Sequence, residues 1–92
     1  MYPGATTRAT EETLVSAATI SPKSDLVLLT GTTSIATINP PFAGFSGFLV
    51  LIPTGGAVSL LASGNIAATA TLTNLVSKVL CYSKKNNKWY SA

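Results

Sequence analysis

The sequence predicts a small all-β domain: an antiparallel β-sandwich, jelly roll or barrel, preceded by an extended N-terminal arm. Short stretches of β-branched and aliphatic residues recur at intervals of about ten residues, and turn-forming residues separate them, as in sandwiches and barrels. A chain of 92 residues forms one domain at most. We therefore assign residues 1–13 to the arm and residues 14–92 to a single β-domain.

The N-terminal arm is polar and is interrupted by proline and glycine. It contains both glutamates of the chain. Such a segment is expected to be disordered, or to become ordered against a partner. Residues 13–20 then predict a weak strand. Residues 21–25 predict a turn, because Pro22 restricts the backbone and Asp25 can bond to nearby amides.

The middle of the chain contains the clearest strand signals. Residues 26–30 and 35–39 predict two short strands, and Gly31 lies in the break between them. Pro40 and Pro41 end the second strand, because proline cannot donate to a β-ladder. After a loop with two phenylalanines, residues 48–52 predict the central strand.

The C-terminal third also contains short strands and turns, but residues 66–80 are ambiguous. Apolar residues there recur at helical spacing, whereas the threonines favour a strand, so a helical turn stays open. No repeat of fixed period is visible. The expected elements are strands at 57–62, 66–72, 75–83 and 88–92, with a bend at Asn74 and a turn at 84–87.

Charged residues are scarce. They make up 10% of the sequence, against about 25% in ordinary soluble domains, and none lies between Asp25 and Lys78. The apolar run at 48–52 is too short for a spanning helix of about 20 residues, and the N-terminus does not resemble a secretory signal. Burial against other protein chains therefore explains this region better than lipid does, and no membrane partner is expected.

The sequence lacks the residue patterns of common catalytic and metal sites. There is no histidine, the carboxylates are few, and Cys81 has no histidine base and is expected to be a buried, inert thiol. We therefore expect neither an enzyme nor a bound metal or cofactor. The basic run at 84–88 is expected to be a solvated hairpin tip, since a nucleic-acid surface would need a broader basic face.

Trp89 and Tyr90 form an aromatic pair near the C-terminus. The ordinary interpretation is that they fill a core or an interface. The alternative is a platform on which a sugar ring stacks at the tip of a fibre.

The order of several short motifs resembles a small β-module of tailed-bacteriophage virion proteins. The motifs are "SPKSDLVLLTGTTSIATINPP", "GFSGFLVLIPTGGAVSLLASGNIA" and "KWY", over about residues 19–91. The resemblance implies an intertwined homotrimer with a structural role. It also implies that the tip has diverged, because "KKNNK" stands where the module often has an acidic Asp-Gly turn.

The resemblance leads to a specific functional expectation. The chain starts at Met1 and has no shaft or enzyme domain, which favours a capsid cement or decoration protein that bridges subunits of the major capsid protein. It would be made in the host cytoplasm and reside on the capsid surface of the virion. The N-terminal arm, including Arg8, Glu11 and Glu12, would bind the capsid or a sister subunit.

The opposite faces of the central strand would pack in the protomer and against its symmetry mates. The expected trimer-interface residues are Phe48, Leu49, Val50, Leu51 and Ile52. The alternative functions are a tail-fibre module that binds host glycans through Trp89 and Tyr90, and a stand-alone binding domain.

Overall fold

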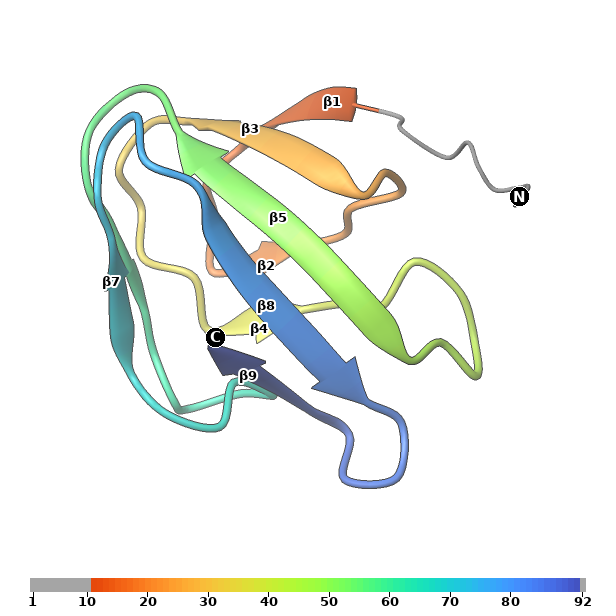
Figure 1. The fold of residues 1–92 in the computed structure, drawn as a ribbon. Coiled ribbons are helices and arrows are strands. Elements are labelled where there is room, and N and C mark those ends of the chain that lie inside the picture. The colour runs from red at the N-terminus through yellow and green to blue at the C-terminus, as the bar shows by residue number, and fades with distance from the viewer. Residues whose placement is uncertain (1–10, 92) are drawn as a thin grey trace.

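The computed structural model describes residues 11–91, which form an all-β domain without a helix (Figure 1). This confirms the predicted all-β class. A five-stranded sheet has the order β1-β3-β5-β8-β9, and two-stranded sheets are formed by β2 with β4 and by β6 with β7. The strands are β1 (Glu11–Val15), β2 (Thr19–Ile20), β3 (Leu26–Thr30), β4 (Thr37–Ile38), β5 (Gly47–Pro53), β6 (Val58–Leu60), β7 (Ala70–Leu72), β8 (Lys78–Ser83) and β9 (Lys88–Ser91).

The pairing directions differ from the predicted antiparallel arrangement. β1, β3 and β5 are parallel neighbours, whereas β8 and β9 join the sheet in the antiparallel sense. Parallel neighbours need long crossover connections. The crossover from β1 to β3 contains β2, and that from β3 to β5 contains β4. The antiparallel prediction is therefore wrong for the N-terminal half. It followed from the turn residues inside these crossovers, which look like hairpin turns in the sequence.

The N-terminal half winds as a parallel coil between two layers. β1, β3 and β5 stack in the first layer (Figure 1). In the second layer β2 pairs in parallel with β4, and Ile35 forms a parallel bridge with Leu60 of β6. The pairs β1–β2, β3–β4 and β5–β6 are therefore successive turns of the coil.

Glycine is required where the corners after β3 and β5 stack. A Cβ atom on Gly55 would lie 2.8 Å from the backbone nitrogen of Gly31. Gly31 has a φ of +75°, which is unfavourable for residues with a side chain. The N–H and the hydroxyl of Thr54 both donate to Leu29 O at 2.8 Å. These contacts hold the two corners against each other.

The second layer contains a short sequence repeat that the sequence analysis missed. Residues 16–22 and 34–40 both read Ser-x-Ala-Thr-Ile-x-Pro, and their Thr-Ile pairs stack in register as β2 and β4. At the following position Asn39 Nδ2 donates to Ser21 Oγ at 2.9 Å. The lengths of the coil turns differ, because the register advances from Glu11 to Leu26 and then to Val50. A search for a fixed period therefore fails.

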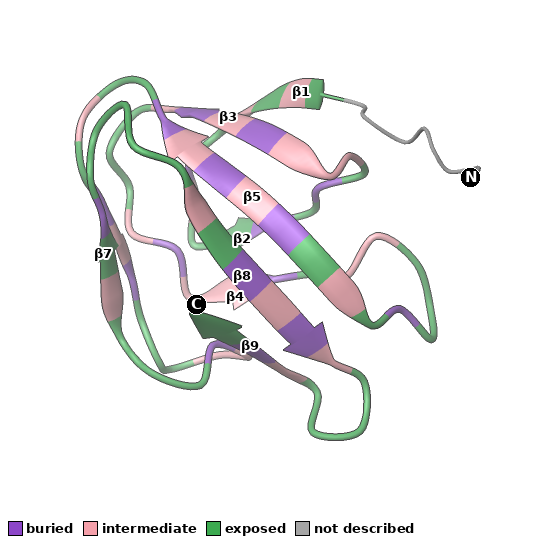
Figure 2. Ribbon diagram, viewed as in Figure 1, coloured by how far each residue is buried: buried purple, intermediate pink, exposed green. Residues whose placement is uncertain are grey.

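A single hydrophobic core lies between the five-stranded sheet and the second layer. Figure 2 shows buried residues alternating with more exposed ones along β5 and β8, as expected for strands with one face on a core. The buried apolar residues are Ile20, Val27, Leu29, Ile35, Ile38, Phe45, Leu49, Leu51, Val58, Leu60, Ile66, Leu72, Leu80, Tyr82 and Trp89.

Part of the predicted N-terminal arm belongs to the five-stranded sheet. Glu11–Val15 forms β1, so residues 11–13 belong to the sheet, while residues 1–10, including Arg8, lie outside the described part of the chain. The Glu12 carboxylate accepts hydrogen bonds from the N–H groups of Lys23 and Ser24, the latter at 2.9 Å. This carboxylate therefore fixes the turn before β3.

The C-terminal half follows the predicted order of strands with shifted boundaries. Residues 66–80, for which the sequence left a helical turn open, contain β7, a turn and the start of β8, and no helical turn. Leu75 has a φ of +64° in this turn, which explains why β8 starts at Lys78 rather than at residue 75. The predicted hairpin tip at 84–87 is confirmed, and it joins β8 to β9.

Candidate interaction surface

One face of the five-stranded sheet, here named the outer face, is apolar and points away from the core. Paired residues in adjacent strands share a face, so the register places these side chains together. The outer face consists of Leu26, Leu28, Phe48, Val50, Ile52, Val79, Cys81 and Tyr90.

The outer face differs from an ordinary solvent-facing sheet, whose outward residues are mostly polar. Phe48 is 65% exposed and Tyr90 is 40% exposed, while Val50 and Cys81 are half-buried. The residues that define this face are uncharged, and the charged residues that the register places at its edges are Glu11 on β1, opposite Leu26, and Lys88 on β9, opposite Ser83. Contiguous apolar surface of this kind is typical of a protein-binding site.

The structure divides the five predicted interface residues into two groups. Leu49 and Leu51 are buried in the core of their own chain, so their assignment to a trimer interface is wrong. Phe48, Val50 and Ile52 lie on the outer face. Successive side chains of a strand point to opposite sides, so a continuous apolar run cannot serve a single interface.

Trp89 and Tyr90 also point to opposite faces. Trp89 is completely buried, its Nε1–H donates to Ile38 O at 2.9 Å, and its ring centroid lies 4.9 Å from that of Tyr82. Tyr90 lies on the outer face, opposite Cys81. The two rings therefore cannot form a shared sugar platform, and the core interpretation of Trp89 is confirmed.

Asn65 closes the edge of β4, a role that the sequence analysis did not foresee. Its side-chain amide donates to Ile38 O at 2.7 Å and accepts from Ile38 N at 2.9 Å, as a neighbouring strand would. The backbone N–H of Trp89 donates to Asn65 O at 2.8 Å. A Cβ on Gly64 would lie 2.2 Å from Ala36 O, so glycine is needed at this position. Gly64 and Asn65 therefore connect β4 to β9.

A pocket of about 430 Å³ opens where the outer face meets the loop before β5. The residues that line it include Phe42, Phe45, Phe48 and Asp25. The Asp25 carbonyl accepts a hydrogen bond from Val50 N at 2.9 Å, which fixes Asp25 beside β5. We name this the aromatic–acidic pocket. Its residues come from separate segments, so no local sequence motif predicts this pocket.

A second pocket, of about 340 Å³, lies on the other side of the same loop. It also contacts Phe42 and Phe45, but its polar residues are Tyr82, Lys84 and Asn87. Phe42 is 63% exposed and borders both pockets. An exposed aromatic ring between two hollows is a suitable anchor for a partner.

The buried polar side chains of the described residues are all hydrogen-bonded. Within residues 11–91 no group of three or more histidine, cysteine, aspartate or glutamate residues could hold a metal ion. In the same range, no buried side-chain nitrogen or oxygen lacks a hydrogen-bond partner. Cys81 is a free, half-buried thiol.

No helix in the described part of the chain combines the length and the hydropathy that a membrane span requires.

Comparison with known proteins identifies no relative. No family model matches the chain, and neither the curated proteins nor the solved structures include a significant match.

Proposed function

We propose that this chain is a non-enzymatic structural protein of a tailed-phage virion, a homotrimeric cement that bridges subunits of the major capsid protein. The observation that carries the proposal is the apolar outer face. An apolar sheet face of this kind is stabilised when other chains cover it, and interfaces between identical subunits are correspondingly apolar. The motif order described above is the reason for choosing a virion protein within this class.

The outer face supplies the contact between protomers in this proposal. Phe48 is the most exposed of its large side chains, and Val50 lies near the middle of the sheet between Leu26 and Val79. Burying a large aliphatic or aromatic side chain contributes about 1.5–3 kcal/mol, which must exceed the entropy cost of association. Several such residues on one face meet this requirement better than an isolated one.

Sedimentation velocity tests the oligomer directly. The wild-type protein is expected to sediment as a trimer at micromolar concentration, and Val50→Asp is expected to sediment as a folded monomer. Thr71→Asp places the same charge at an exposed position of β7 and should leave the trimer intact. A wild-type monomer would refute the proposal.

Cys81 provides a second readout without any engineering. The thiol lies on the outer face between Phe48 and Tyr90, so trimer formation should cover it. A thiol reagent is expected to modify Cys81 slowly in the wild-type protein and rapidly in Val50→Asp. Equal rates would show that the outer face is not the interface.

The contact with the capsid is proposed for the N-terminal segment, with Arg8 and Glu11 as its charged residues. Glu12 is less available, because its carboxylate holds the turn before β3. Deleting residues 1–10 leaves β1 in place. The truncated protein should remain a trimer but lose binding to capsids assembled without the cement, and unchanged binding would remove the segment from the proposal.

A second candidate function is a receptor-binding module at a fibre tip, favoured by the pocket that contains Tyr82, Lys84 and Asn87. Aromatic walls with a few polar groups suit a sugar ring. Trp89 is no longer a suitable test residue, because its loss would damage the core. Instead, binding to a glycan array that disappears in Lys84→Ala, with the trimer intact, would favour this function over the cement.

A further inference from the structure

The two ends of the parallel coil differ in how they are covered. At the C-terminal end, β8 pairs with β5 and β7 pairs with β6, both in the antiparallel sense, so both layers of the last turn have a neighbour. At the N-terminal end, within residues 11–91, β1 pairs only with β3 and β2 only with β4. Coils of stacked turns need a cap at each end, because an open end exposes unpaired backbone groups.

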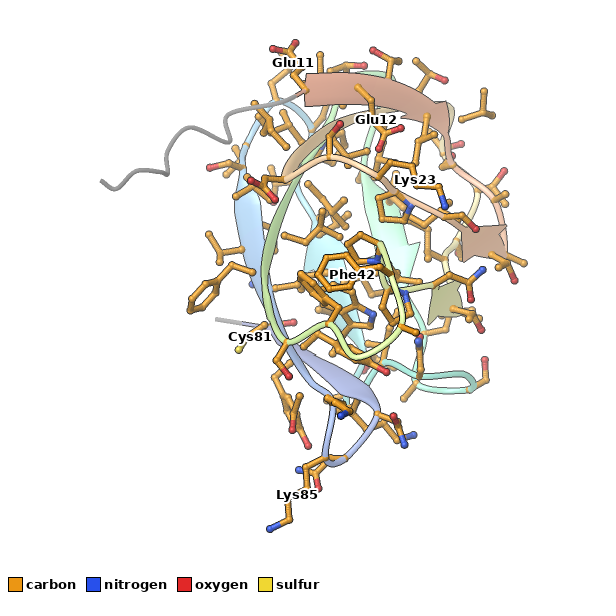
Figure 3. The ribbon with its side chains drawn as sticks, turned by 90° about the vertical axis from the view of Figure 1, so that its right-hand side faces the viewer. Glu11, Glu12, Lys23, Phe42, Cys81 and Lys85 are labelled. Carbon is orange, nitrogen blue, oxygen red and sulfur yellow. The ribbon has the colours of Figure 1, made fainter. Side chains whose placement is uncertain are left out.

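The open edge of the five-stranded sheet is β1 rather than β9. The backbone N–H of Trp89 donates to Asn65 O at 2.8 Å, and Trp89 O accepts from Ala67 N at 2.9 Å, so the far side of β9 is bonded. In Figures 1 and 3, β1 lies at the upper border of the molecule, and Figure 3 labels Glu11 and Glu12 on it. A further strand therefore has access to β1.

The orientation of β1 determines which backbone groups its open edge presents. Ser16 N donates to Thr30 O of β3 at 2.9 Å. Backbone groups point alternately to the two sides of a strand, so every second residue bonds to β3 and the groups of Glu11, Thr13 and Val15 point to the open edge. Within residues 11–91 no strand pairs with this edge. The side chains of these three residues are exposed.

We infer that β1 of one copy pairs in the antiparallel sense with β1 of a second copy, about a two-fold axis at Thr13. Thr13 then lies opposite the second copy's Thr13, and Glu11 lies opposite the second copy's Val15. In these pairs the two residues exchange both N–H···O=C bonds, so the contact uses all the groups that β1 presents at its open edge. The strand is its own complement, which is the requirement for a two-fold contact.

Charge and strand orientation select this register. A shift of one residue would place groups that already bond to β3 opposite the open-edge groups. A shift of two residues toward the N-terminus would bring the two Glu11 carboxylates to diagonal positions, where like charges repel. The opposite shift leaves Glu11 beyond the end of the other β1. In the register centred on Thr13, the two Glu11 side chains lie at opposite ends of the contact.

The edge contact and the outer face do not compete. Paired residues share a face, so the outer faces of the two copies lie on the same side of one continuous sheet and stay uncovered by this contact. Such a short edge supplies few hydrogen bonds, so the pairing is weak in dilute solution. Protomers held side by side on a capsid meet at a much higher effective concentration. The inference therefore goes beyond the proposed trimer and adds a link between neighbouring trimers.

Disulfide cross-linking tests both the partner and the register. In an antiparallel pair of this kind the Cα atoms are about 5.5 Å apart, a separation that a disulfide spans. With oxidised glutathione as the oxidant and at high protein concentration, Thr13→Cys/Cys81→Ser should form a covalent dimer on a non-reducing gel. Glu11→Cys/Cys81→Ser changes the same strand and face but should stay uncross-linked. Mixing it with Val15→Cys/Cys81→Ser should restore the cross-link.

A proline substitution tests the hydrogen bonds without an added thiol. Thr13→Pro removes an N–H that points to the open edge and takes no donor from the ladder with β3. It should weaken the association seen by sedimentation equilibrium at high concentration by roughly tenfold, since two symmetry-related bonds are lost. Thr13→Val keeps the N–H and should associate as the wild type does. Circular dichroism confirms that each variant is folded.

The outcomes separate this inference from the proposed function. If Thr13→Cys/Cys81→Ser forms no dimer, or Glu11→Cys/Cys81→Ser cross-links equally well alone, the β1 pairing is wrong, and another segment or protein covers the edge. Cross-linking through Thr13→Cys that persists with Val50→Asp supports a contact separate from the outer face, and its loss would overturn that separation. A wild-type trimer without the cross-link leaves the proposed function standing. A wild-type monomer that still cross-links through Thr13→Cys refutes the trimer and keeps the edge contact.

Discussion

The two faces of β5 are both apolar but lie in opposite environments. Leu49 and Leu51 pack into the core, while Phe48, Val50 and Ile52 lie on the outer face. Their chemistry does not distinguish the two groups, so the difference arises from which layer of the same chain covers which face. Folding of a single chain therefore buries only one face of a uniformly apolar strand, and the other face needs a second cover.

The same contrast occurs between adjacent residues in the strands on either edge. In β9, Trp89 is buried and Tyr90 lies on the outer face. In β1, the Glu12 carboxylate accepts backbone hydrogen bonds and Glu11 is exposed. The two residues of each pair have opposite orientations, so substituting them separately tests whether one side chain is buried and the other exposed.

The largest contrast is expected between Leu51→Ala and Val50→Ala. Leu51→Ala leaves a cavity in the core and should lower the free energy of unfolding by about 2–5 kcal/mol. Val50→Ala should cost less than about 1 kcal/mol in the monomer, mainly through lower β-propensity. Urea denaturation below the dissociation constant of the oligomer measures both. Equal losses would mean that one chain buries the two faces equally.

An intermediate contrast is expected between Trp89→Phe and Tyr90→Phe. Trp89→Phe removes the donor to Ile38 O inside the core and should cost about 1–3 kcal/mol of unfolding free energy. Tyr90→Phe removes an exposed hydrogen bond from Asn86 and should change stability by less than about 0.5 kcal/mol. Thermal denaturation followed by circular dichroism measures the difference. A larger effect of Tyr90→Phe would contradict the assigned orientations.

The smallest contrast is expected between Glu12→Gln and Glu11→Gln. Glu12→Gln replaces a charged acceptor of two backbone N–H groups by a neutral one, which should cost about 0.5–1.5 kcal/mol. Glu11→Gln removes the same charge at an exposed position and should be nearly neutral. Denaturation curves of the two variants provide the comparison. If Glu12→Gln instead left stability unchanged and abolished capsid binding, Glu12 would return to the capsid-binding segment.

The strands with strong local signals were predictable. Residues 26–30 form β3 as expected, and the predicted strand at 48–52 lies within β5, because Gly31 follows the first run and Gly47 and Pro53 flank the second. The weaker strand at 13–20 divides into β1 and β2 around the buried Ser16, whose Oγ accepts from Thr33 N at 3.0 Å. That division depends on a contact between distant residues, which local propensity does not contain.

The candidate interaction surface was predictable in part. The scarcity of charge predicted an apolar surface that other chains cover, and the structure places Phe48 and Val50 on the outer face. The aromatic–acidic pocket joins Asp25 to Phe42 and Phe48, which come from different turns of the coil. The sequence contains these residues but has no local pattern that brings them together.

Amino-acid order specified which segments become strands, because apolar and β-branched runs, prolines and glycines act over a few residues. It also specified that the chain has little charge for solvating an apolar surface. Pairing direction, the layer crossed by each connection and the face that stays uncovered followed from long-range packing instead. The period of two along a strand allows either face to be the buried one. The inner and outer faces become distinct only when the strands of the five-stranded sheet pack around one core.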